Sequence, residues 1–200
     1  MKRIALLYVI LCMPLLANAQ TKMPTLDDLD NEIVLSPQYD KKYEDVILGV
    51  KKQLHTAKTQ QARYELSDRL FNLYTSYSVD SAIVYAIKKQ NVAKQMGDKT
   101  KVNDAKLNLA YLMIKGGQLK DASDIINSIP RNEIDKELSF YYFSTRKTLY
   151  STLADGSLTS WQQKNYQQLA KISNDSIVDN NASADSWSRA EQLVNRHQYA

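Results

Sequence analysis

The chain has little of the residues that mark disulfide-linked or β-rich proteins. Its 200 residues contain one cysteine, five glycines and four prolines. A single cysteine excludes an intrachain disulfide, so packing alone must hold the fold together. The shortage of glycine and proline excludes the many tight turns that a β-sandwich or barrel needs, and it favours an all-α chain.

The sequence patterns of common enzymes and metal sites are also missing. The two histidines, His55 and His197, lie far apart, and there is no H-E-x-x-H, G-x-S-x-G, P-loop or Rossmann glycine pattern. A general acid needs a desolvated cleft, which nothing predicts around the glutamates that lie in helical patterns: Glu65, Glu133, Glu137 and Glu191. We therefore predict no enzymatic activity, no cofactor and no metal, and interpret these glutamates as surface charge.

No strong excess of one charge sign is present. The chain has 26 Lys and Arg against 22 Asp and Glu, a formal net charge of +4. The charges are interspersed, as expected for solvated helix faces. This balance predicts no nucleic-acid partner for this segment.

Residues 1–19 have the organisation of a secretory signal peptide. Lys2 and Arg3 precede an apolar stretch over residues 4–16, and residues 17–19 (A-N-A) form a cleavage site that leaves Gln20 as the new N-terminus. The stretch is shorter than the roughly 20 residues that span a bilayer. Cys12 follows Leu11 rather than a small residue, which makes a poor lipidation site. We predict an exported protein, cleaved between Ala19 and Gln20, with no membrane span in its mature segment.

A helical pattern recurs about 40 residues along the chain. Its first copy places apolar or small residues at Leu70, Leu73, Tyr77, Ala82 and Ala86. The second copy has them at Ala110, Met113, Gly117, Leu119, Ala122 and Ile126. Similarity at a fixed period indicates a helical solenoid, in which small residues such as Ala82 and Ala122 allow two helices to cross closely.

Hydrophobic periodicity and capping signals predict helices over residues 39–58, 60–77, 80–96, 99–115, 118–128, 133–153 and 158–172. A short helix over 26–30 is expected between Pro24 and Pro37. Trp161 is expected on an apolar face. Residues 174–183 lack apolar periodicity and predict a loop, and residues 186–196 predict the start of another hairpin.

This hairpin pattern resembles the tetratricopeptide repeat (TPR). The order of Tyr74, Tyr77, Asp80-Ser81-Ala82 and Tyr85-Ala86, then Gly97-Asp98 and Ala105 to Ala110, is similar to exported TPR-bearing putative regulators of Gram-negative gut bacteria. The resemblance implies an all-α, right-handed α-α solenoid of antiparallel helix hairpins, facing the periplasm. It also implies a peptide-binding groove at Asn108, Tyr111 and Lys115. Proteins of that kind continue into a membrane span and a cytoplasmic part.

The expected organisation is therefore a signal peptide (1–19), an N-terminal leader (20–38) and a TPR-like domain (39–200). Residues 195–200 resemble the hinge of a repeat whose second helix would follow, so we expect the domain to be truncated at its C-terminal end. The tyrosines serve either as packing between helices or as contact area in a groove. Ser81 and Ser176 each lie in a short D-S-x pattern used for bacterial O-glycosylation.

The favoured function is a periplasmic scaffold that binds a protein or peptide as the sensor or interaction part of a membrane-linked regulator. One alternative is a glycan-binding outer-membrane lipoprotein built on TPR-type repeats, which palmitate incorporation would favour. The other is a peptidoglycan-active helical enzyme, which turnover of cell-wall fragments would support. The ligand and the oligomeric state are left open.

Overall fold

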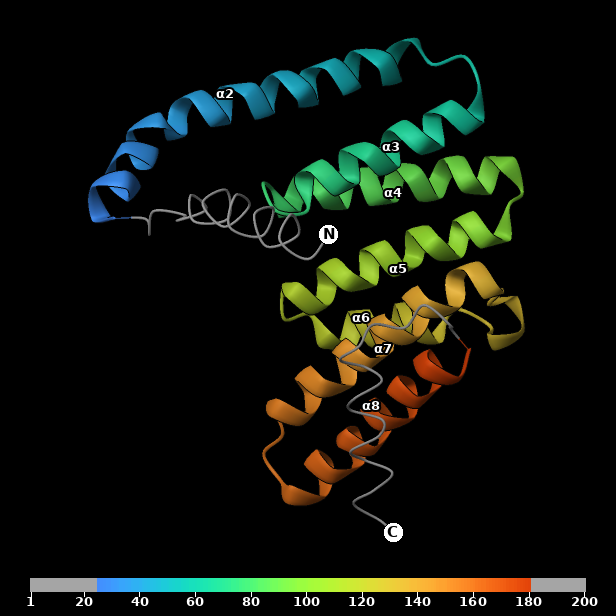
Figure 1. The fold of residues 1–200 in the computed structure, drawn as a ribbon. Coiled ribbons are helices and arrows are strands. Elements are labelled where there is room, and N and C mark those ends of the chain that lie inside the picture. The colour runs from blue at the N-terminus through green and yellow to red at the C-terminus, as the bar shows by residue number, and fades with distance from the viewer. Residues whose placement is uncertain (1–24, 181–200) are drawn as a thin grey trace, which may run out of the picture. The chain divides into compact units, whose positions relative to one another are not determined.

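The computed structural model describes residues 25–180, which form seven α-helices, one 3-10 helix and no strand (Figure 1). This confirms the predicted all-α repeat fold. The elements are α2 (Leu26–Thr56), α3 (Gln60–Tyr74), α4 (Val79–Met96), α5 (Lys99–Lys115), α6 (Leu119–Asn127), η1 (Arg131–Glu133), α7 (Lys136–Asp155) and α8 (Ser160–Asn180). The chain divides into two compact units, residues 1–45 and 46–200.

The described part of the first unit is the N-terminal portion of α2. Thr25 and Asp28 cap it reciprocally: the backbone N–H of Asp28 donates to Thr25 Oγ1 (3.2 Å), and that of Thr25 to Asp28 Oδ2 (2.8 Å). The expectation that a helix ends before Pro37 and a new one begins at residue 39 is wrong, because α2 is continuous through Pro37. Proline removes one helical hydrogen bond. Pro37 is exposed, so water can replace the lost partner.

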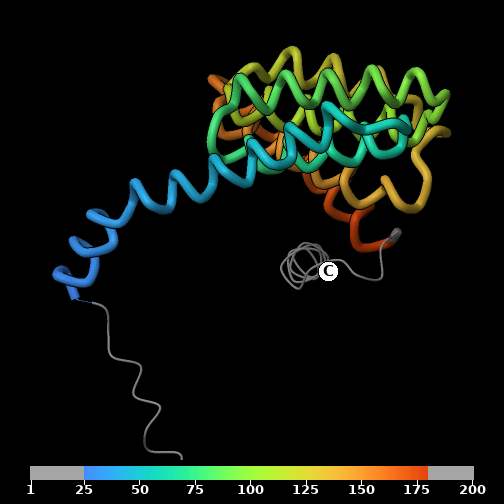
Figure 2. The backbone as a smooth tube through the Cα atoms, turned by 90° about the horizontal axis from the view of Figure 1, so that it is seen from above, coloured from blue at the N-terminus to red at the C-terminus, as the bar shows by residue number. Residues whose placement is uncertain are grey.

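Helices α3 to α8 of the second unit pack in sequence order and run in alternating directions (Figures 1 and 2). Helix α5 also packs directly against α7. Five helices of this unit begin at a side chain that accepts a hydrogen bond from the backbone three residues later: Thr59 for α3, Ser78 for α4, Asp98 for α5, Asp135 for α7 and Thr159 for α8. Helix α4 ends at Gly97, whose φ of +68° is a conformation that glycine adopts without strain.

The two hairpins place their corresponding residues similarly. Ala82 in α4 and Ala122 in α6 are both completely buried. Leu70, Ala86, Ala110 and Ile126 are also buried, whereas Leu73, Met113 and Leu119 are half-buried. Gly117 lies in the turn between α5 and α6 with φ +74°. The main apolar core joins α5, α6 and α7 through Leu107, Ala110, Ile114, Ala122, Ile126, Ile129, Leu138, Tyr142 and Leu149.

Tyr77 departs from its predicted packing role. Helix α3 ends at Tyr74, three residues earlier than the periodicity predicts, and Tyr77 lies in the following turn with 45% of its surface exposed. The turn results from Ser78, which caps α4 and so fixes where the new helix begins. The Tyr77 ring still lies 6.4 Å from that of Tyr74.

The last described helix differs most from its prediction. Helix α8 continues to Asn180, although a loop was expected from residue 174. Ser173, Asn174 and Ile177 are buried, and Lys147 of α7 donates to Asn174 Oδ1 (3.0 Å). Polar residues therefore occupy part of the packed face of α8, which explains why the sequence shows no apolar periodicity from residue 174. Trp161, expected on an apolar face, is 75% exposed.

Three predictions concern residues outside the described range 25–180. These are the cleavage site at Ala19 and Gln20, the end of the expected loop at residues 181–183, and the expected helix over 186–196. His197 and Glu191 lie outside it as well. None of the helices within residues 25–180 combines the length and hydrophobicity needed to cross a bilayer.

Candidate functional site: a polar face on α3, α5 and α7

The centre of the candidate site is a buried lysine. Lys89 of α4 is only 1% exposed. It follows Ala82 and Ala86 and precedes Ala93 at helical spacing, and all three alanines are buried. These four residues share one face of α4. The lysine side chain therefore points into the interior, between α4 and its neighbours α3 and α5.

Three acceptors surround the Lys89 ammonium group. Its Nζ atom donates to Asp68 Oδ1 of α3, and it lies 2.5 Å from Asp104 Oδ2 and 2.8 Å from Asn108 Oδ1, both of α5. Two of these contacts, to Asp68 and Asn108, are hydrogen bonds, and the contact with Asp104 is an ion pair. The lysine thereby ties three consecutive helices together by polar contacts.

Two tyrosines extend this network. The Tyr64 hydroxyl donates to Asp104 Oδ2 (2.6 Å), and Asn108 Nδ2 donates to the Tyr141 hydroxyl of α7 (2.8 Å). Burial, and then the hydrogen bond to Asp104, raises the pKa of Tyr64 far above its usual value. Burial also raises the pKa of Tyr141 to about 12. Both phenols are consequently neutral at physiological pH.

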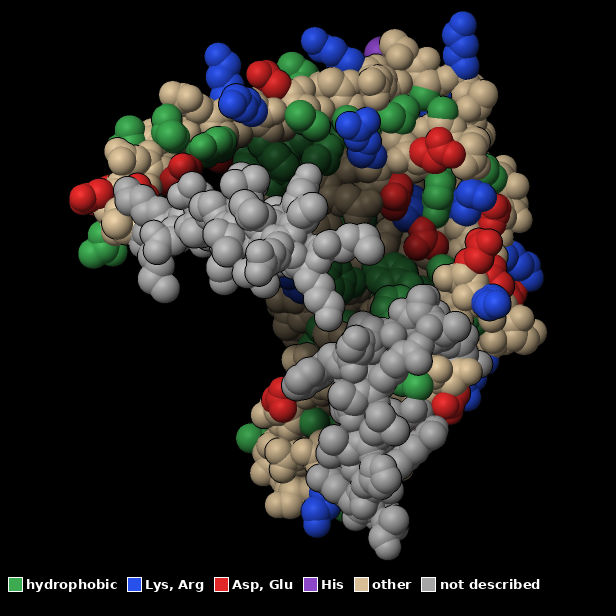
Figure 3. All heavy atoms as spheres, in the orientation of Figure 1, with side chains coloured by type: hydrophobic (Ala, Val, Ile, Leu, Met, Phe, Trp, Pro, Cys, Tyr) green, Lys and Arg blue, Asp and Glu red, His purple; other side chains and the backbone are tan. Residues whose placement is uncertain are grey.

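The carboxylates of the network lie at the border between interior and solvent. The side chains of Asp68 and Asp104 are 38% and 27% exposed, against 2% for Lys89. Figure 3 shows acidic and basic side chains gathered over α3 to α5. Removing one member of a buried ion pair leaves its partner uncompensated, at a cost of about 3–5 kcal/mol. The network thus fixes the polar atoms that this face presents to solvent.

The predicted groove residues belong to one stripe of α5. Asp104, Asn108, Tyr111 and Lys115 recur at helical spacing on a single face. Asn108 is buried and its amide is engaged with Lys89 and Tyr141. Tyr111 is half-buried, and Lys115 is exposed with its Nζ atom 5.7 Å from the Tyr111 ring centroid. The structure therefore places Tyr111 and Lys115 at the surface and Asn108 beneath it.

The glutamates weighed as catalytic groups have ordinary surroundings. Glu65 and Glu137 are exposed. Lys99 donates a hydrogen bond to Glu133 (2.7 Å), which lowers the pKa of that carboxyl. A general acid requires the opposite shift. Residues 25–180 contain no group of three His, Cys, Asp or Glu side chains arranged to hold a metal ion.

Sequence reasoning missed Lys89, Asp68 and Asp104. The pair Lys88-Lys89 looks like ordinary surface charge. The available signal was positional, because Lys89 occupies the stripe set by Ala82, Ala86 and Ala93. A lysine on an otherwise small, apolar stripe is almost never fully buried without a partner. Its position therefore predicts carboxylate partners on the helices that face this stripe.

Antiparallel helix pairs that stack in sequence order define the class of helical-repeat proteins. Residues 33–200 match the family described as "SusR N-terminal TPR domain", and the chain belongs to this family. Domains of the TPR type are generally non-catalytic scaffolds that mediate protein interactions. Comparison with curated proteins and with solved structures gave no significant match.

Proposed function

We propose that this chain is a periplasmic scaffold that binds a protein or peptide, and that it is the sensor or interaction part of a membrane-linked regulator of a Gram-negative gut bacterium. The observation that carries the proposal is the α5 stripe anchored by Lys89. The stripe offers the Tyr111 ring, Lys115 and the Asp104 carboxylate, which Lys89 holds in place. The signal-peptide pattern of residues 1–19 supports export.

The network supports binding because it is ordered before a ligand arrives. Side chains that must be immobilised on binding cost about 0.5–1.5 kcal/mol each. Asp68 and Asp104 are already held by Lys89, so a peptide meets their carboxylates without that cost. Tyr111 adds contact area with few rotatable bonds, as tyrosine does at many interfaces. We expect a peptide to lie across α3, α5 and α7.

Peptide selection on the purified protein tests the binding role. We expect selected peptides to lose about tenfold in affinity with Tyr111→Ala, measured by isothermal titration calorimetry. Tyr166→Ala is the matched control, because Tyr166 is an equally half-buried tyrosine on α8. Equal losses of peptide affinity in both variants, or no loss in either, would contradict binding at this face.

Export and the regulator role have separate tests. Alkaline phosphatase fused after Ala200 should be active in a Gram-negative host, and inactive when residues 2–19 are deleted. Activity in both fusions would contradict the signal peptide. The reading frame downstream of the Ala200 codon tests the regulator role. A further helix and an apolar run of about 20 residues support it, whereas a stop codon leaves a free periplasmic adaptor.

A further inference from the structure

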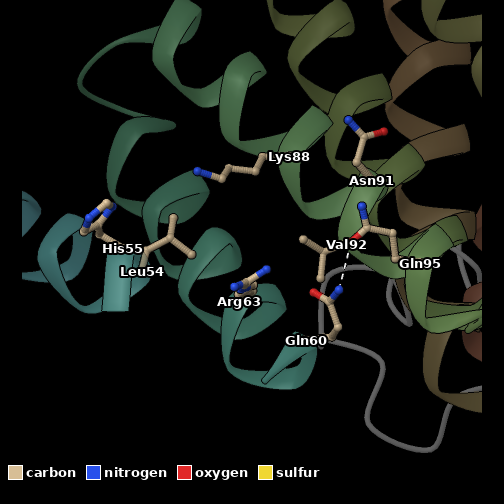
Figure 4. Close-up of a pocket in the computed structure, with 8 residues that line it drawn as sticks. All are labelled: Leu54, His55, Gln60, Arg63, Lys88, Asn91, Val92 and Gln95. Atoms are coloured by element: carbon tan, nitrogen blue, oxygen red, sulfur yellow. Dashed lines mark hydrogen bonds between the residues drawn. The ribbon is translucent and has the colours of Figure 1, made fainter. Parts of the chain in front are cut away.

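A second surface, separate from the α3, α5 and α7 face, lies where α2 ends against α3 and α4. It is a pocket of about 360 Å³ (Figure 4). Its lining comes from the last residues of α2, the first turn of α3 and the C-terminal half of α4: Leu54, His55, Gln60, Arg63, Lys88, Asn91, Val92 and Gln95. All of these residues belong to the second unit.

Helix α4 supplies this pocket from a different face than the one that carries Lys89. Lys88, Asn91 and Gln95 follow one another at helical spacing. Lys89 and Ala93 form the neighbouring buried stripe. A ligand in the pocket therefore does not contact the buried network, and the two surfaces are available independently.

The lining is cationic and contains no carboxylate. It includes Arg63, Lys88 and the imidazole of His55, and Figure 4 shows these side chains around a common space. The Nε atom of Arg63 donates to the carbonyl oxygen of Ala57 (3.1 Å), which orients the guanidinium group. Within residues 25–180 the Arg63 Nη atoms and Lys88 Nζ make no hydrogen bond. The Arg63 donors are thus oriented and unused, and Lys88 Nζ lies 6.0 Å from the Tyr85 ring centroid without a carboxylate partner.

Four other lysines of the same unit are neutralised by carboxylates of the chain itself. Lys89, Lys99, Lys101 and Lys120 each form an ion pair with an aspartate or glutamate. Arg63 and Lys88 are gathered in a hollow without such partners. Like charges gathered on a concave surface raise the local concentration of anions. The pocket is therefore suited to an external negative group.

The remaining lining fits a peptide. Gln60 Nε2 donates to Gln95 Oε1 (2.9 Å) at one end of the pocket, and the Asn91 carboxamide can pair with a peptide backbone. Leu54 and Val92 are buried and form an apolar floor. No aromatic ring lines the pocket, so a sugar would find no ring on which to stack. These features favour a peptide over a glycan.

We propose that this pocket binds a side-chain carboxylate of an acidic peptide segment in a protein partner. The Arg63 guanidinium holds the carboxylate through paired N–H donors, and Lys88 supplies a second positive charge. The site goes beyond the proposed groove function. A groove that bound no peptide would leave the pocket assignment standing.

The test uses the whole purified chain and a dye-labelled hexaglutamate peptide, with hexaglutamine as the uncharged control. Fluorescence anisotropy at low salt should show binding of hexaglutamate only. The variant Arg63→Gln/Lys88→Gln should lose at least about tenfold in affinity. The matched variant Lys136→Gln/Lys164→Gln removes the same charge from exposed positions outside the pocket and should change affinity by less than about twofold.

Equal losses in the two variants would overturn the proposal, because a diffuse positive field would then explain binding. Equal binding of hexaglutamine would overturn it as well. Displacement of hexaglutamate by inorganic phosphate, but not by chloride at matched ionic strength, would assign the pocket to a free anion instead. The groove variant Tyr111→Ala should leave hexaglutamate affinity unchanged, which separates this site from the proposed groove. Unaltered urea midpoints would establish that both charge variants fold.

Discussion

Lys88 and Lys89 are neighbours in the sequence, yet they define two different surfaces of the same helix. Lys89 is buried, and its charge is matched by Asp68 and Asp104. Lys88 is exposed and lines a pocket without carboxylates. A charge neutralised inside the chain holds helices together, whereas a charge on a concave surface without carboxylates is open to a partner. Loss of each lysine should therefore have a different consequence.

The largest effect is expected from Lys89→Met. The variant leaves Asp68 and Asp104 facing each other without their cation, and should lower the free energy of unfolding by about 3 kcal/mol, the low end for a broken buried pair, because both carboxylates are partly exposed. Urea denaturation followed by circular dichroism measures this loss. Lys88→Met is the control and should stay within about 0.5 kcal/mol of the parent chain. Similar losses for both lysines would remove the distinction between the two surfaces.

A smaller loss is expected from Tyr64→Phe. This change deletes the hydroxyl that donates to Asp104 and retains the buried ring. A hydrogen bond to a charged group contributes about 1.5–3 kcal/mol, and we expect a loss in that range in urea denaturation. Tyr85→Phe is the matched control, since the hydroxyl of Tyr85 has no hydrogen bond within residues 25–180. A loss as large as that of Tyr64→Phe would contradict the role assigned to the network.

Raising the pH from 9 to 11 should lower the free energy of unfolding by about 1 kcal/mol, because Tyr141 ionises more easily in the unfolded chain. Its pKa is raised to about 12 in the folded chain from an ordinary value of 10.0. The stabilisation is therefore complete below pH 10 and is lost as pH rises towards 12. Urea midpoints across this range should fall less steeply for Tyr141→Phe than for the parent chain. Parallel pH profiles would show that Tyr141 does not titrate in this way.

The smallest effect is expected at Lys120, which is paired with Asp124 on the surface of α6 (2.6 Å). Both side chains are mostly exposed, so water and salt screen their attraction. Lys120→Ala should leave the urea midpoint unchanged within error. A drop comparable to that of Lys89→Met would mean that burial does not decide the strength of these pairs.

Much of the repeat framework could be predicted because its signals are local. Gly97, the Gly116-Gly117 turn and Pro130 mark helix ends by backbone chemistry, and the observed α4 and α5 match the predicted ranges within one residue. Positions such as Tyr77 and Trp161 could not be predicted. Their exposure depends on where a neighbouring helix begins or lies.

The buried polar residues of these helices were harder to predict from the sequence. Helix α8 buries Ser173 and Asn174, and α4 buries Lys89, so an apolar period cannot reveal these faces. The partners of Lys89 and Asn174 lie on other helices, 15 to 27 residues away in the sequence. The sequence therefore predicted Asn108, Tyr111 and Lys115 of α5 as site residues, but it did not predict the buried Lys89.

Charge rescue tests whether Lys89 stabilises the fold by compensating two carboxylates. The variant Lys89→Met/Asp68→Asn/Asp104→Asn should be at least about 2 kcal/mol more stable to urea than Lys89→Met alone, because no uncompensated charge remains. A triple variant that is less stable than Lys89→Met would contradict the account.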